Sequence, residues 1–324
     1  MKYIIGAYAS APSVWLQDKE EESSFYNLLK EKIENIKGLE IPFYGNQIHQ
    51  FGDDFLIDKL EPSWSNTITA IPASFNYLKQ DIHFGLASDH EESRLLAMQC
   101  HLKLNALVHK INDNKGKKAI SSIQICSSPS FPRDNVFSSE ESFKKSLEEL
   151  LSWDWDDSSI LIEHCDSHQG SSDYQKGFFQ IEREIKILDE LGNDNLGITL
   201  NWGRSVLEGK DIEQIIKHIK LSQDKKYLKG FIFSGTSPDD PHYGSWSDLH
   251  MPFQNESELN NRYTNSLLTD ENVLSTLKNL QYDEIDYLGV KLQPLPQELL
   301  TIKERVDINI SAIRTLDNLI SQLN

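Results

Sequence analysis

The stretch Ile160-Leu161-Ile162-Glu163-His164-Cys165-Asp166 decides the fold of this chain. Three consecutive aliphatic residues predict a strand that is buried on both faces, as in a parallel sheet covered by helices. Polar residues follow directly where the strand ends. Parallel α/β proteins place their chemistry at the carboxyl ends of their strands, so further strands of this chain should end in the same way.

The rest of the chain repeats this pattern of an apolar run followed by a helical segment. The other predicted strands span residues 3–8, 39–43, 68–71, 119–126, 197–200, 230–233 and 287–292. Apolar spacing and cap residues predict helices over residues 25–36, 88–111, 139–151, 176–191, 211–222, 269–280 and 297–319.

Eight strands at spacings of roughly 30 to 55 residues are typical of a (β/α)8 barrel, which needs about 250 residues or more. An open doubly wound sheet is the alternative, but neither a G-x-G-x-x-G motif nor a P-loop follows any predicted strand. We therefore predict an α/β fold, with residues 1–324 forming a single TIM-barrel domain.

Composition narrows the range of partners. The chain has 32 Lys and Arg against 50 Asp and Glu, a formal net charge of -18, which would repel nucleic acid and anionic membrane surfaces. No stretch approaches the ~20 apolar residues of a membrane span. Cys100, Cys126 and Cys165 show no CxxC spacing, which indicates a reducing compartment, so we predict a cytoplasmic protein. The sequence leaves open whether the chain forms a homo-oligomer.

The predicted strand ends supply the first candidate site residues. In a closed barrel the ends of the fifth to eighth strands share one mouth. These ends carry Glu163, His164 and Asp166, then Asn201 and Arg204, then Ser234, and finally Lys291. The alternative for each is a helix cap or a turn. Because side chains alternate along a strand, His164, Cys165 and Asp166 cannot all reach one metal ion, and we expect Cys165 to be a small core residue.

Arg204 and Lys291 are the two candidate cations. Arg204 follows Asn201 across Gly203, where it would suit a carboxylate or phosphate oxygen; the alternative is a salt bridge to Glu208 or Asp166. A lysine in an apolar barrel mouth must be paired or neutral. Lys291 is therefore a candidate electrophile, a candidate Schiff-base nucleophile, or one half of a structural ion pair.

The long loop after the seventh predicted strand supplies further candidates. His242, Trp246, Asp248 and His250 offer an aromatic face and hydrogen-bonding groups of the kind that hold a sugar ring. Asp248 could instead fix the tautomer of His250. The alternative is a surface loop that packs its own aromatic residues. In the earlier loops we expect structural roles for Tyr8, His49, Asp89, His90 and Arg133, and a helix-face pair between Glu91 and Arg94.

Five motifs together resemble an uncharacterised bacterial family of xylose-isomerase-like barrels, known as a domain of unknown function. They are Gly85-Leu86-Ala87-Ser88, Ile162-Glu163-His164-Cys165-Asp166, Asn201-Trp202-Gly203-Arg204-Ser205, Phe233-Ser234-Gly235 and Leu288-Gly289-Val290-Lys291. The likeness spans nearly the whole chain and implies a xylose-isomerase-like TIM barrel.

The wider group of sugar isomerases and epimerases with this fold implies a divalent metal held by Glu, Asp, His and Glu at strands five to eight. Glu163 matches the first position, whereas Asn201, Ser234 and Lys291 stand at the other three. Such a set lacks the negative charge that Mg or Mn sites require. We therefore expect the usual metal site to be degraded, although Asp166, His242 or His250 could build another one for Mg, Mn or Zn.

Together, the residues and the resemblance predict an enzyme that acts on a small-molecule carbohydrate, a sugar isomerase or epimerase or a related lyase. Glu163 would be the base, Lys291 or Arg204 would stabilise an enolate, and Asn201, Trp246 and His250 would hold the substrate. Arg204 favours a sugar acid or sugar phosphate. The alternatives are a Schiff-base aldolase that uses Lys291 and a sugar-binding protein without activity.

Overall fold

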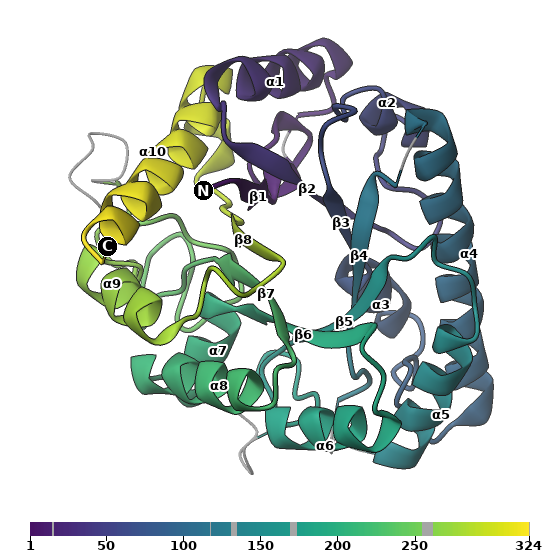
Figure 1. Ribbon diagram of the computed structural model, residues 1–324. Helices are drawn as coiled ribbons and strands as arrows, with labels where there is room; N and C mark the ends of the chain where they lie inside the picture. Colours follow the sequence, from purple (N-terminus) through teal and green to yellow (C-terminus); the bar gives the residue numbers. More distant parts are fainter. Residues whose placement is uncertain (15, 117, 131–134, 169–173, 255–261, 324) are drawn as a thin grey trace. The chain divides into compact units, whose positions relative to one another are not determined.

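The computed structural model describes residues 1–14, 16–116, 118–130, 135–168, 174–254 and 262–323. Within these ranges, eight strands follow one another in chain order around a closed barrel (Figure 1). The strands are β1 (Tyr3–Ile5), β2 (Ile36–Pro42), β3 (Asn66–Thr69), β4 (Ile120–Ile125), β5 (Ser159–His164), β6 (Leu196–Asn201), β7 (Leu228–Phe233) and β8 (Tyr287–Val290). The predicted TIM barrel is therefore confirmed.

Strand β5 behaves as its aliphatic run predicts. Every residue of the strand from Ile160 to His164 is buried. It pairs in parallel with β4, so that Ile123 lies opposite Ile160 and Ile125 opposite Ile162. The first strand closes on the last in the same parallel sense, with Ile5 opposite Val290. Residues buried on both faces are what a parallel sheet covered by helices requires.

The helices of the described ranges follow the strands. They are α1 (Lys19–Lys32), α2 (Asp53–Ile57), α3 (Ile71–Leu78), α4 (Glu91–Lys115), α5 (Glu140–Leu151), α6 (Ile181–Leu191), α7 (Trp202–Gly209), α8 (Ile212–Asp224), α9 (Asp270–Asn279) and α10 (Ile302–Ser321). Short 3-10 turns lie at Ala7–Ala9, Pro12–Val14 and Gln297–Leu299. In the part of the chain that the structure describes, no helix combines the length and the apolar character needed to cross a membrane.

The chain forms two compact units, each discontinuous in sequence. Unit 1 contains residues Met1–Glu40, Leu200–Gln223 and Gly230–Asn324, and unit 2 contains Ile41–Thr199 and Asp224–Lys229. Within unit 1, helix α10 packs against both α1 and α9; within unit 2, α5 packs against both α4 and α6 (Figure 1). That residues 1–324 form one domain stays a prediction.

Several predicted helix caps are confirmed. The side chains of Ser139 and Thr269 each accept a hydrogen bond from the backbone three residues on, and thereby cap α5 and α9. Helix α4 begins three residues later than predicted. Helix α4 begins at Glu91 with His90 as its N-cap, and the Ser88 hydroxyl accepts the backbone N–H of His90 instead of capping the helix itself.

Two short helices at strand ends were missed by the sequence analysis. Ile71 was assigned to a strand that Pro72 ends, but β3 ends at Thr69 and Pro72 lies in the first turn of α3, where proline is well tolerated. No helix is predicted directly after Asn201, but Asn201 caps α7. The first predicted helix also begins and ends earlier, because Ile36 belongs to β2.

Unit 1 joins its first strand to its last helix through Asp317. The Tyr3 hydroxyl donates to one Asp317 oxygen at 2.6 Å, and the Asn35 amide donates to the other at 3.2 Å. Burial, together with this hydrogen bond to a carboxylate, raises the pKa of Tyr3. The phenol therefore stays protonated and keeps its donor role over the whole physiological pH range.

Helix α4 carries a histidine without a partner at one ring nitrogen. The Nδ1–H group of His101 donates to the Ala97 carbonyl at 2.8 Å, and its buried Nε2 atom has no hydrogen-bond partner in the described residues. Burial lowers the pKa of His101 from 6.5 to about 4. The ring is therefore neutral in the folded protein at pH 7 and resists protonation there.

This histidine predicts a loss of stability in mild acid. The unfolded chain binds the proton first as the pH falls below about 6.5, so stability that is complete above that pH is lost progressively down to about 4. The full shift corresponds to at most about 3 kcal/mol. Urea unfolding at pH 7.5 and 5.0 should show a smaller pH dependence for His101→Leu than for the wild type. The exposed His242 provides the control, since His242→Gln should leave the pH dependence unchanged.

Candidate functional site

Glu163 lies buried on β5 in unit 2, where the sequence analysis expects the catalytic base. The Thr69 hydroxyl at the end of β3 donates to its Oε2 atom at 3.1 Å. That hydroxyl in turn accepts the backbone N–H of Ile71, in the first turn of α3, at 3.3 Å. The Thr69 hydroxyl thus orients the Glu163 carboxylate, which accepts its hydrogen bond.

His164 turns to a different partner from Glu163, as alternation along a strand requires. Its Nδ1 atom lies 2.8 Å from Oε2 of Glu184, a buried residue of α6. The other Glu184 oxygen accepts the Ser127 hydroxyl at 2.7 Å. This chain of contacts joins α6 to the ends of β4 and β5.

Asp166 also makes structural contacts. One carboxylate oxygen accepts the backbone N–H groups of Gln175 and Lys176 at 2.7 and 2.8 Å. The Lys176 ammonium lies 3.7 Å from the other oxygen. Cys165 packs against Ile71, Cys126 and Phe178, in agreement with the expectation of a small core residue.

Lys291, directly after β8 in unit 1, forms a buried ion pair. Its ammonium donates to Oε1 of Glu40, on β2, at 2.6 Å, and both side chains are almost completely buried. The ring of Tyr8 lies beneath the ammonium, with 5.5 Å between Nζ and the ring centroid. Glu40 was missed by the sequence analysis, although a glutamate between Leu39 and Ile41 in an apolar strand is an available signal.

The stem of Lys291 needs the glycine at the end of β1. A Cβ atom on Gly6 would lie 2.9 Å from both Cβ and Cγ of Lys291, closer than real Cβ contacts come. The absence of a side chain at residue 6 therefore lets the lysine pass β1 on its way to Glu40.

Asn201, the last residue of β6, uses only half of its amide within the protein. Its Oδ1 atom accepts the backbone N–H of Arg204 at 3.3 Å and so caps α7. Its Nδ2 group is completely buried and has no acceptor among the described residues. A buried donor without an acceptor is costly, so this amide is suited to donate to a ligand oxygen.

Arg204 and His250 meet on Asp248. The Arg204 Nε–H group donates to Oδ2 of Asp248 at 3.1 Å, so the salt-bridge alternative holds with a partner that was not anticipated. The other Asp248 oxygen lies 3.6 Å from Nδ1 of His250. The same ring nitrogen lies 2.7 Å from the Ser234 hydroxyl, so the loop acid and histidine are joined to the end of β7.

Backbone contacts hold these unit 1 groups close together. The N–H of Lys291 donates to the Phe233 carbonyl at 2.9 Å, and that of Gln293 to the His250 carbonyl at 2.7 Å. A Cβ atom on Gly203 would lie 2.4 Å from the Ser234 carbonyl oxygen, so glycine is required where α7 begins. We call the group of Glu40, Asn201, Arg204, Ser234, Asp248, His250 and Lys291 the polar cluster.

The other residues of the loop after β7 make contacts of their own. His242 is exposed, and its backbone N–H donates to Asp240 at 2.8 Å. Trp246 is half-buried, with a left-handed backbone at φ 49°, and its N–H donates to the Ser237 carbonyl. Tyr243 is buried and donates to the Gln293 carbonyl at 2.6 Å, which pins the loop to the segment after β8.

The early-loop candidates make the structural contacts expected of them. His49 packs against Phe51 and Phe55, and Nδ1 of His90 lies 2.8 Å from the Ser93 hydroxyl. Arg94 forms the expected pair with Glu91, its Nε–H donating at 2.8 Å. Arg133 lies outside the described residues.

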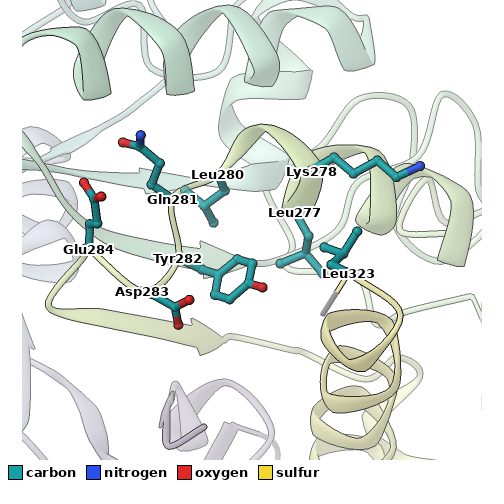
Figure 2. A pocket seen from close by; sticks show the side chains of 8 residues that line it. All are labelled: Leu277, Lys278, Leu280, Gln281, Tyr282, Asp283, Glu284 and Leu323. Atoms are coloured by element: carbon teal, nitrogen blue, oxygen red, sulfur yellow. The ribbon is translucent and has the colours of Figure 1, made fainter.

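A hollow of about 400 Å³ lies elsewhere in unit 1 (Figure 2). It is lined by Leu277, Lys278, Leu280, Gln281, Tyr282, Asp283, Glu284 and Leu323. All of them except Leu323 lie in the last turn of α9 or in the loop between α9 and β8, so they precede the strand, whereas Lys291 follows it. The hollow is therefore at the opposite end of β8 from the polar cluster, and its residues include none of those predicted from the strand ends.

The chain belongs to a family that its own sequence identifies. Residues 4–308 match the family described as a domain of unknown function, DUF4862. An uncharacterised protein of Salmonella typhimurium strain LT2 is 31% identical over 307 residues, covering 95% of this chain and 92% of its own length. The suspected family is thus confirmed.

Solved structures agree on the fold at low sequence identity. The IolI protein, solved with a bound zinc atom, is 16% identical at a TM-score of 0.58, covering 99% of each chain. An L-ribulose 3-epimerase is 9% identical at a TM-score of 0.58, covering 100% of this chain and 97% of its own. A D-allulose 3-epimerase from Methylomonas, in complex with D-allulose, is 12% identical at a TM-score of 0.55, covering 98% and 96%.

The divalent metal that the family resemblance implies does not fit the residues at these strand ends. At β8 the group present is an ammonium already paired with Glu40, and ammonium nitrogens have no lone pair for a cation. At β6 the side-chain oxygen of Asn201 caps a helix, and its Nδ2 group, which has no partner among the described residues, is a hydrogen-bond donor. Hard cations require several oxygen lone pairs, which these groups do not offer.

The Lys291–Glu40 pair predicts a strong coupling between two substitutions. Removing one partner of a buried ion pair leaves an uncompensated charge, so Glu40→Gln and Lys291→Met should each lower the free energy of unfolding by about 3–5 kcal/mol. The double variant should recover most of that loss, because no buried charge remains. Chemical denaturation of the four proteins measures this coupling.

A surface ion pair is the matched control for this cycle. Lys186 donates to Glu140 at 2.6 Å, but its side chain is 61% exposed. Lys186→Met should therefore cost less than about 1 kcal/mol. If the Lys291→Met variant is no less stable than the Lys186→Met variant, the buried pair does not have the energetic role described.

Proposed function

We propose that this protein is an enzyme that acts on a carbohydrate, a sugar isomerase or epimerase that moves a proton next to a carbonyl group. Support comes from two proteins of similar fold, which are named as a D-allulose 3-epimerase and an L-ribulose 3-epimerase. The observation that carries the proposal is the buried Lys291–Glu40 pair at the carboxyl end of β8, because barrel enzymes keep their chemistry at that end. A buried charge there is costly and has no evident use in a protein without a ligand.

The proposed roles follow from the local surroundings of each group. Glu163 is the base, because the Thr69 hydroxyl orients its side chain and a carboxylate can take up the proton. The C–H bond next to the carbonyl breaks, its electron pair forms a carbon–carbon double bond, and the carbonyl electrons move onto oxygen. Lys291 stabilises that oxygen. Delivery of a proton to the opposite face of the same carbon completes epimerisation. In isomerisation the proton goes to the former carbonyl carbon, and the proton of the neighbouring hydroxyl moves to the former carbonyl oxygen, so that a new carbonyl forms at the neighbouring carbon.

The charge balance of the polar cluster favours an uncharged sugar. The Arg204 guanidinium is paired with Asp248, and the Lys291 ammonium is paired with Glu40. An added carboxylate or phosphate would meet two carboxylates along with the two cations. We therefore propose a neutral ketose or aldose, in place of the sugar acid or sugar phosphate expected from Arg204 alone. Asn201, His250 and Trp246 would hold its oxygens and ring.

The Schiff-base alternative is less well supported. A lysine attacks a carbonyl only as a neutral amine, whereas a carboxylate at 2.6 Å favours the ammonium form of Lys291. Borohydride added with D-allulose or L-ribulose should leave the mass of the protein unchanged. A covalent adduct on Lys291 would instead establish the aldolase-like chemistry.

Proton exchange in heavy water tests the proposed function directly. The purified protein, incubated in D2O with L-ribulose, D-allulose or D-fructose, should incorporate deuterium at the carbon next to the carbonyl, which NMR detects. Glu163→Gln should lower this rate by about 100-fold or more, since the general base is lost. The exposed Glu298 provides the control, because Glu298→Gln should exchange at the wild-type rate.

Two outcomes would contradict the proposal. Full exchange by the Glu163→Gln variant would refute the role of Glu163. Saturable sugar binding by the wild type without any exchange would instead establish a sugar-binding protein without activity.

A further inference from the structure

The polar cluster offers positive charge and N–H donors at strand ends where the family resemblance implies metal ligands. In unit 1 these positions are Asn201 on β6, Ser234 after β7 and Lys291 after β8. Two of these three residues carry buried hydrogen-bond donors, which are the ammonium of Lys291 and the amide of Asn201. The third, the Ser234 hydroxyl, is joined to His250 at 2.7 Å.

A dication at this place would be opposed by the cluster itself. The negative charge of Glu40 is already balanced by Lys291, whose Nζ atom lies 2.6 Å away in a buried setting. That of Asp248 is balanced by Arg204 at 3.1 Å. Two paired carboxylates leave no surplus negative charge to hold a divalent ion, and charges at short range repel strongly where water is excluded.

The amide of Asn201 needs an acceptor. The Nδ2 group of Asn201 is completely buried and lacks an acceptor among the described residues. A metal ion cannot satisfy an N–H donor, whereas a hydroxyl or carbonyl oxygen of a sugar can. This second observation is independent of the ion pair and points to an oxygen-bearing ligand in place of a cation.

We infer that the polar cluster works without a metal: the Lys291 ammonium, held by Glu40, supplies the positive charge that polarises the carbonyl oxygen of the substrate, and Asn201 donates to another sugar oxygen. The activity part of this inference rests on the proposed function, whereas the metal-binding part does not. The ligand class is an uncharged hydroxy-ketone or hydroxy-aldehyde. Lys291 acts only as a charged donor, and the proton that moves goes to and from the base.

The glycine at residue 6 supports the assignment by restricting where the ammonium can go. The Lys291 stem runs past Gly6 at a distance that excludes a Cβ atom, and the ammonium lies over the Tyr8 ring. A flexible surface lysine would not need this arrangement. The charge is therefore positioned before a substrate binds, as electrostatic stabilisation of a transition state requires.

The test combines metal binding with proton exchange. The wild type, dialysed against EDTA, should take up no Mn2+ in titration calorimetry with MnCl2, and its deuterium exchange on L-ribulose or D-allulose should be the same within twofold with EDTA or with MnCl2. Lys291→Met should lower exchange by about 100-fold or more, because the charge at the developing oxyanion is lost. The thermal stability of the wild type and that of Lys291→Met should each be no higher with MnCl2 than without it.

A charge-reversing variant gives the opposite expectation for the metal. Lys291→Glu places a second carboxylate beside Glu40, and this variant should bind Mn2+ measurably and be stabilised by it against heat, because a surplus of carboxylate oxygens is what Mn2+ prefers. Lys291→Met is its matched control, since it removes the ammonium without adding a carboxylate. If Lys291→Glu or Lys291→Met does not fold, the wild-type titration and the exchange rate of the Glu40→Gln/Lys291→Met double variant, which should recover most of the lost stability, decide the matter.

Three results would overturn the inference. The first is one tightly bound metal per wild-type chain. The second is deuterium exchange by the wild type that EDTA abolishes and MnCl2 restores. The third is a Lys291→Met variant that exchanges at the wild-type rate. A wild type that exchanges no proton under any condition would refute the proposed function instead, and the calorimetric comparison of wild type with Lys291→Glu would then still decide whether the site takes a metal.

Discussion

The ion pair between Lys291 and Glu40 is the interaction on which the unit 1 site depends. Both side chains are almost completely buried, and the two charged atoms lie 2.6 Å apart. Neither charge would be tolerable alone, because removing an ion from water costs several kcal/mol. The pair therefore places a full positive charge where β8 ends, beside the backbone contact of Lys291 with Phe233 on β7. The other polar groups of the cluster are arranged around a cation that the chain itself provides.

The sequence was sufficient for the fold because the fold depends on short apolar runs and their spacing. Each of the eight predicted strands corresponds to an observed one, and Ile160 to His164 are buried as the aliphatic run requires. Three helices lie outside the predicted ranges: α2 in the loop after β2, and α3 and α7, which follow strand ends directly. There Pro72 and Asn201 suit both a turn and the first turn of a helix, so residue type alone does not decide between them.

The site could be predicted only in part. A strand-end rule singles out Lys291 and Asn201, but it says nothing about which partner each one finds. Glu40 lies about 250 positions before Lys291 in the chain, and the Arg204–Asp248 pair spans the whole of β7. Such partners are fixed by the closing of strands on one another and not by local pattern. His164 illustrates the converse case, since a suggestive position beside Glu163 holds a residue whose contact is with helix α6.

Gly6 has a consequence for how freely the ammonium moves. A lysine on a protein surface samples many rotamers, and fixing one of them on ligand binding would reduce affinity. Here the absence of a side chain at Gly6 leaves room for the aliphatic part of Lys291, and the Tyr8 ring lies beneath the ammonium. The rotational entropy of the lysine is thus lost when the chain folds, not when a sugar arrives. Binding free energy that would otherwise immobilise the lysine remains available for discriminating between one sugar and another.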